Sequence, residues 1–124
     1  MTVAELYDQI GGSYNEVKMR LPMDPLVSRF VIKFLHDPSS EQLIAAGKAG
    51  DEEALFKAAH AVKGVCANLA ITRLADLASQ ITEATREGNE AIRANTNLDE
   101  LVAQFEVAYG ETAAAIRAFE AQQG

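Results

Sequence analysis

The sequence predicts an all-α protein, an antiparallel four-helix bundle with an additional short N-terminal helix. Composition, capping signals and the spacing of apolar residues support this fold class. Aromatic residues make up only 6% of the chain and tryptophan is absent, whereas β-sheets are enriched in aromatic and β-branched residues. With 48% hydrophobic residues among 124, one domain can bury a core without disulfides or structural metal ions. We therefore expect a single domain over residues 1–124.

Capping residues and chain breakers divide the first part of the chain into short helical segments. Thr2 and Glu5 have the spacing of a capping box, in which each side chain bonds the backbone N–H of the other residue. The pair Asp37-Pro38 interrupts a longer helical pattern, because proline clashes with the preceding helical turn. The expected helical segments are residues 3–10, 25–36 and 39–46, with a short turn over residues 14–21 and with Gly47 to Gly50 closing the last segment.

The next helix is expected to begin after Asp51, which caps it, with Glu52 and Glu53 near the positive end of the helix dipole. Its apolar residues recur at intervals of 4, 3, 4 and 3, which is typical of a helix that faces a bundle core. These residues are Leu55, Ala59, Val62, Cys66 and Leu69. We therefore expect the thiol of Cys66 to be buried and inert.

Two further helices complete the predicted bundle. One begins near residue 72 and ends before Gly88, and a long final helix begins after a capping box at Asn97 and extends to residue 119. Residues 89–96 fit either a helical extension or a loop. Gly110 lies on the outer side of the final helix, and nothing in the sequence explains it.

The side of the Asp51 helix that faces away from the core lacks the charges of an ordinary solvated face. At about 100° per residue, His60 lies roughly 140° around the helix from Leu55. No carboxylate occurs between Phe56 and Asn68, and Lys57 and Lys63 supply the positive charge. The other positions near His60 on this side are Phe56, Ala61, Gly64, Ala67 and Asn68. The face is therefore suited to the approach of another molecule.

Gly64 and Lys63 suggest what chemistry this face performs. A glycine inside a helix costs about 0.5–1 kcal/mol relative to alanine, and the apolar pattern continues beyond Gly64, so this glycine does not end the helix. Its missing side chain leaves space beside the imidazole of His60, and Lys63 at i+3 can bring a cation within reach. A neutral imidazole nitrogen is a nucleophile. A phosphoryl group therefore suits this position.

Simpler interpretations remain open for the same residues. Most histidines on helix surfaces have no special function, and a helical glycine can also mark close packing against another helix. Lys57 is the better candidate for an ordinary solvated charge. His36 lies near the expected end of a helix, where the negative end of the helix dipole stabilises a cation.

Other function classes find little support. The net charge of 11 − 18 = −7 disfavours nucleic acid and anionic membranes as partners. Cys66 and the two histidines lack metal-ligand spacing, and no glycine-rich nucleotide loop is present. The segment 1–10 carries Glu5 and Asp8 without the basic and apolar runs of a signal peptide, and no apolar stretch reaches membrane-spanning length. We therefore expect a cytoplasmic protein that receives its phosphoryl group from another protein.

The segment Ala58–Ala70 resembles the signature of histidine-containing phosphotransfer (HPt) domains, which is alanine-histidine-x-leucine-lysine-glycine followed after four residues by leucine-glycine. Val62 replaces the usual leucine and Ala70 replaces the second glycine. The similarity extends to Phe34-Leu35 with Asp37, to Ala49-Gly50-Asp51, and to Leu74, Leu77, Ile81 and Arg86-Glu87-Gly88. The resemblance implies that His60 is phosphorylated, that Lys63 supports the phosphoryl group and that Gly64 leaves room for it.

We therefore expect a phosphorelay intermediate in which His60 exchanges a phosphoryl group with an aspartate of a receiver (response-regulator) domain, or accepts it from a sensor or hybrid histidine kinase. Docking is expected to use Phe56, Lys57, Ala61, Ala67 and Asn68. We expect a monomeric phosphocarrier rather than a turnover enzyme, with no cofactor or metal of its own, any magnesium belonging to the receiver. One alternative is an adaptor that binds receivers without transfer. Another is the phosphoacceptor domain of a chemotaxis-type kinase, although Met1 and the early capping box favour a free-standing protein.

Overall fold

A computed structural model describes residues 1–123, and this part of the chain is helical throughout, without strands. Its helices are α1 (Val3–Gln9), α2 (Tyr14–Arg20), α3 (Asp24–Phe34), α4 (Ser39–Ala49), α5 (Glu52–Asn68), α6 (Thr72–Thr85), α7 (Glu90–Ala94) and α8 (Leu98–Gln123). Within these residues, no helix combines the length and the apolar character needed to cross a membrane. The all-α class predicted from the sequence is therefore confirmed.

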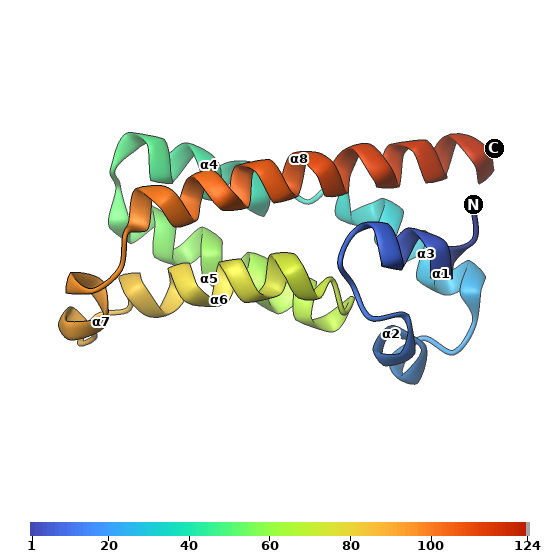
Figure 1. Cartoon of the computed structure of the whole chain (residues 1–124), viewed down its shortest axis with the longest axis horizontal. Coiled ribbons are helices and arrows are strands. Elements are labelled where there is room, and N and C mark those ends of the chain that lie inside the picture. Colours follow the sequence, from blue (N-terminus) through green and yellow to red (C-terminus); the bar gives the residue numbers. More distant parts are fainter. Residues whose placement is uncertain (124) are drawn as a thin grey trace.

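Four of the helices contact one another in a closed cycle. Helix α5 contacts α4 and α6, and α8 contacts both α6 and α4 (Figure 1). The apolar pattern of α5 lies inside this cycle, where Leu55, Ala59, Val62, Cys66 and Leu69 are all buried. The predicted core-facing side of α5 is therefore confirmed, and the opposite side faces outward.

The chain contains more short helices than the single additional one expected from the sequence. Helices α1 and α2 are separate seven-residue helices, and the 89–96 segment contains the five-residue α7. Figure 1 shows α1 and α3 beside the C-terminal half of α8, while α4, α5 and α6 lie beside its N-terminal half. Two groups of helices thus lie along α8, one after the other. The breaks between the first helices of the chain allow this segment to fold back on α8.

Several helix ends differ from the sequence prediction, including that of α4. Helix α4 continues through Gly47 to Ala49, and Gly50 ends it with a left-handed φ of +70°. A Cβ at Gly47 would lie 2.5 Å from Cγ1 of Val102 in α8, so glycine allows these two helices to approach closely. Helix α6 ends at Thr85, before Gly88 as expected.

The turn after α5 forms without the glycine that usually ends this helix in the resembling family. Ala70 adopts the left-handed conformation with φ +54°. The backbone N–H of Ile71 donates to the Cys66 carbonyl at 2.9 Å, and that of Ala70 donates to Ala67 at 3.1 Å. This is the Schellman pattern of a helix C-terminus. Arg20 of α2 also donates to the Ala67 carbonyl at 2.9 Å. This tertiary hydrogen bond stabilises the end of α5, where Ala70 has a left-handed conformation that glycine adopts more easily.

Candidate functional site

Helix α5 positions the candidate site residues, and its N-terminus is well defined. The side chain of Asp51 accepts a hydrogen bond from the Ala54 N–H at 3.1 Å, as the sequence predicts for an N-cap. Buried Ala59 and Val62 fix the rotation of the helix about its own axis. His60, next to them in the chain, is exposed. The helix thus presents this imidazole to solvent on a rigid backbone.

The surroundings of His60 are as open as the sequence predicts. Ala61, Ala67 and Asn68 are all exposed. A Cβ built on Gly64 would meet no atom within 4 Å, apart from the backbone of its own helix and its chain neighbours. Gly64 therefore has no packing role against another helix, which excludes the close-packing interpretation of this glycine. Its free surface lies one helical turn from the imidazole.

An aromatic stack accompanies the imidazole. The rings of Phe56 and His60 lie nearly parallel, with a 13° angle between their planes and 5.9 Å between their centroids. The guanidinium carbon of Arg86, which follows α6, lies 5.4 Å from the centroid of the Phe56 ring. Phe56 is half-buried, whereas the other residues expected to dock are exposed. The i, i+4 spacing of Phe56 and His60 is a signal for this contact, whereas nothing local in the sequence brings Arg86 to it.

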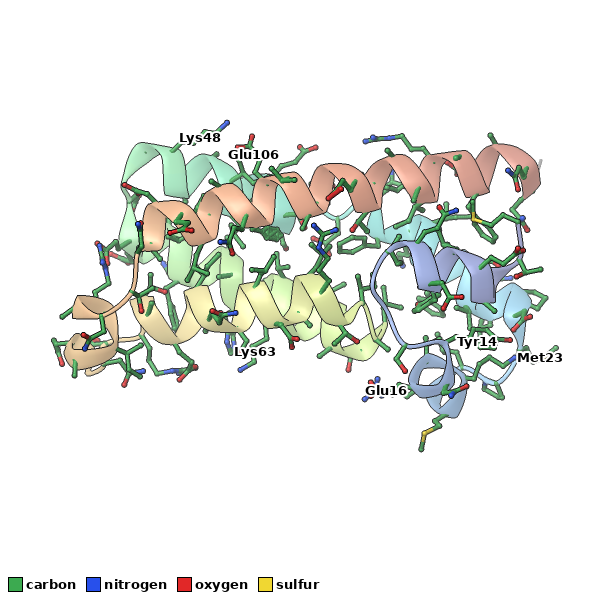
Figure 2. The ribbon with its side chains drawn as sticks, viewed as in Figure 1. Tyr14, Glu16, Met23, Lys48, Lys63 and Glu106 are labelled. Atoms are coloured by element: carbon green, nitrogen blue, oxygen red, sulfur yellow. The ribbon has the colours of Figure 1, made fainter. Side chains whose placement is uncertain are left out.

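The two lysines of this face differ in their surroundings. Lys57 is exposed and forms an i, i+4 ion pair with Glu53 at 3.5 Å, which is typical of a solvated helix surface. Lys63 is half-buried, and in Figure 2 it extends away from the bundle on the side opposite the Lys48–Glu106 ion pair. Its charge also reaches α6: hydrogen bonding from Arg86 lowers the pKa of Glu83, and the charges of Arg86 and Lys63 lower it further.

The remaining reactive groups lie away from this face. Cys66 is buried, and burial raises the pKa of its thiol to about 12, so it is an inert core thiol as predicted. His36 is exposed just beyond the end of α3. Within residues 1–123, no three His, Cys, Asp or Glu side chains are grouped as metal ligands would be. His60 is therefore the nucleophilic side chain that the fold displays on the carboxylate-free face.

Comparison with known proteins identifies the family of the chain. The model of the Hpt domain family matches residues 37–117, which is more than half of the chain and includes all of α4, α5, α6 and α7. Residues 1–36, with α1, α2 and α3, lie outside the matched range. No curated protein and no solved structure matched the chain. The chain belongs to the Hpt domain family, whose members take part in phosphorelay signalling.

Proposed function

We propose that this protein is a phosphorelay intermediate in which His60 accepts a phosphoryl group from a receiver aspartate or a histidine kinase and passes it to a receiver aspartate. One observation carries the proposal. The exposed imidazole of His60 lies one turn from the open surface of Gly64, on a helix face without carboxylates. In this proposal α4, α5, α6 and α8 form an antiparallel four-helix bundle in a single domain, which holds α5 rigid.

The chemistry requires only a nucleophile and local positive charge from this chain. A lone pair on an imidazole nitrogen of His60 attacks the phosphorus of an aspartyl phosphate. The P–N bond forms while the P–O bond to the aspartate breaks, and the aspartate leaves as a carboxylate. Lys63 offsets the negative charge on the transferring phosphoryl oxygens. The reverse step returns the phosphoryl group to a receiver, which supplies its own magnesium.

Receiver docking is proposed on the surface formed by Phe56, Lys57, Ala61, Ala67 and Asn68 around His60. The stretch of α5 from Phe56 to Asn68 has no carboxylate, which suits it to a receiver's acidic pocket, because like charges across an interface oppose association. A net charge of −7 would otherwise disfavour such a partner. We propose a monomer, since one chain supplies every group in this site. The cytoplasmic location expected from the sequence stays a prediction.

Transfer from a labelled receiver tests this function directly. Incubation with a receiver domain carrying radiolabelled phosphate on its aspartate should yield an acid-labile, alkali-stable label on this protein. His60→Gln should abolish that label. His36→Gln is the matched control, because His36 is the second of the two histidines and is also exposed, and this variant should take up label normally.

Two outcomes contradict the proposal in different ways. Label that survives His60→Gln would mean that another residue accepts the phosphoryl group. Binding of receivers without any transfer to the wild-type protein would instead favour the non-phosphorylated adaptor. A panel of receivers from the same cell, assayed for both binding and transfer, separates these outcomes.

A further inference from the structure

The imidazole of His60 is exposed, yet group transfer needs its ring held in one orientation. An exposed histidine rotates about two side-chain bonds, and only some of the resulting rotamers aim a nitrogen at the incoming phosphorus. Reactions accelerate when the reacting atoms are already held in the geometry of attack. A device that restrains this ring would therefore raise the rate of transfer without contacting the phosphoryl group.

Phe56 provides such a restraint. It lies one turn before His60, and side chains in helices lean towards the N-terminus, so the imidazole leans towards the Phe56 ring. The 13° angle between the ring planes and the 5.9 Å between centroids describe a stacked pair. Aromatic pairs of this kind contribute beyond the area that they bury. The stack leaves the neighbouring surface at Gly64 open, where an added Cβ would meet no atom of another helix within 4 Å.

Arg86 in turn holds the Phe56 ring from a different helix. Its guanidinium carbon lies 5.4 Å from the ring centroid, which is within the range of a cation–π contact. The guanidinium is itself fixed, because Nε and Nη2 of Arg86 both donate to Oε2 of Glu83, at 3.2 and 3.0 Å. The side-chain amide of Asn89 donates to the backbone carbonyl of Glu83 at 3.0 Å, which orders the chain that follows α6.

We propose that Phe56 and Arg86 are positioning residues for phosphotransfer, which orient the His60 imidazole through the Arg86–Phe56–His60 stack. The inference rests on the proposed function of His60 and assigns Phe56 a role beyond receiver docking. Because Arg86 acts only through Phe56, the two residues behave as one unit. Loss of either should slow the transfer step itself, whereas a change in the affinity for the receiver is expected only from loss of Phe56, through its proposed docking contact.

Single-turnover transfer from a phosphorylated receiver, measured over a range of receiver concentrations, separates these effects. Phe56→Leu keeps an apolar side chain but removes the stack, and should lower the maximal rate about threefold to tenfold. The receiver concentration at half-maximal rate reports the docking contact of Phe56 separately from this loss. Phe56→Tyr keeps the ring and should restore the rate. Circular dichroism at the assay temperature confirms that each variant is folded.

Substitution of Arg86 tests whether the two residues act as a unit. Arg86→Met keeps the aliphatic stem and should lower the maximal rate about twofold to threefold. The double variant Phe56→Leu/Arg86→Met should be no slower than Phe56→Leu alone, because the effects of substituting two residues in contact do not simply add. Arg93→Met is the matched control, because it removes the Arg93–Glu52 ion pair without touching an aromatic ring. This control should transfer at the wild-type rate.

A spectroscopic measurement keeps this inference distinct from the proposed function. The Phe56 ring current should shift the ring-proton NMR signals of His60, and the shift should disappear in Phe56→Leu and persist in Phe56→Tyr. Unchanged His60 signals in Phe56→Leu would overturn the stack. Wild-type rates in Phe56→Leu, or a loss confined to the half-maximal concentration, would overturn the positioning role while His60 still took up label. A wild-type protein that accepts no label would overturn the proposed function and the positioning role together, whatever the NMR signals show.

Discussion

Gly47 in α4 and Gly64 in α5 both lie inside helices, where each weakens the local helix by about the same amount relative to alanine. Their surroundings are opposite. A Cβ at Gly47 would be 2.5 Å from Cγ1 and 2.9 Å from Cγ2 of Val102, whereas a Cβ at Gly64 would meet nothing within 4 Å. Gly47 thus allows two helices to pack closely, and no packing contact accounts for Gly64.

The difference between these two glycines teaches how to separate structural from functional small residues. A glycine with a close neighbour has a reason within the fold, so its substitution should affect stability. A glycine without one weakens the helix with no compensating contact, which points to something outside the chain. Gly110 in α8 is a useful third case, because it also has nothing within 4 Å but lies away from α5.

The largest effect on stability is expected for Gly47→Ala. The new methyl group would overlap the side chain of Val102, so the helices must move apart, at a loss of about 1–3 kcal/mol in the free energy of unfolding. Chemical denaturation measures this loss. Phosphotransfer should stay within about twofold of the wild-type rate at temperatures where the variant is folded. No change in the activation free energy of transfer is expected, and ~1.4 kcal/mol would be needed for a tenfold change in rate.

A second substitution in α8 checks the mechanism of that loss. Val102→Ala removes the atoms that the new methyl group would meet, so the double variant should be more stable than the sum of the single effects predicts. A Gly47→Ala protein as stable as the wild type would show that α8 adjusts freely, and the contrast between the two glycines would fail.

Gly64→Ala should have the reverse pattern. Its methyl group enters open space on a helix surface, so the free energy of unfolding should rise by about 0.5–1 kcal/mol. Phosphotransfer should slow about tenfold, equivalent to ~1.4 kcal/mol, because the methyl group occupies the space proposed for the phosphoryl group. The two measurements are denaturant unfolding and the single-turnover transfer rate.

Gly110→Ala is the matched control for this variant. It should be stabilised by a similar amount for the same reason, yet transfer phosphate at the wild-type rate. Equal rates for Gly64→Ala and the wild type would remove the functional explanation of Gly64. Slower transfer in Gly110→Ala would mean that general stiffening of the helices, rather than lost space, slows the reaction.

The two lysines on the exposed side of α5, Lys57 and Lys63, should differ by a smaller factor. Lys63→Gln should slow transfer about threefold to fivefold, since a partly solvated cation stabilises phosphoryl charge only modestly. Lys57→Gln should leave the maximal rate unchanged, because this exposed side chain is already paired with Glu53. Equal effects of the two substitutions on the maximal rate would contradict a specific role for Lys63.

The smallest effect near neutral pH concerns Cys66, on the opposite side of α5 from Gly64. Burial raises the pKa of its thiol from 9.0 to about 12. As pH rises above about 9, the unfolded chain loses this proton before the folded protein does, so the stability of the fold should fall between those values. Unfolding measured from pH 7 to 11 should show no effect at pH 7–8, and Cys66→Ala should reduce the alkaline loss.

A thiol reagent provides an independent check of the same burial. At pH 7.5 the native protein should not react with it, and reaction should follow unfolding. Rapid labelling of the native protein would mean that the apolar side of α5 is open, and would remove the distinction between its buried and exposed sides.

Local patterns in the sequence determined much of the fold and the placement of the site. The all-α class, the capping of α5 at Asp51, its buried stripe and the exposure of His60 were all predicted correctly. These features depend on helical periodicity and on side chains that bond the nearest backbone groups, so short stretches of sequence suffice to predict them.

Contacts between residues far apart in the chain were decided only by the tertiary structure. Gly47 of α4 lies close against Val102 of α8, Arg20 of α2 donates to the Ala67 carbonyl at the end of α5, and Arg86 reaches Phe56 from beyond α6. None of these pairs shares a local pattern, since each depends on how whole helices pack. Periodicity therefore placed His60 on the surface, while the packing of α4 and α6 against α5 determined which neighbours surround it.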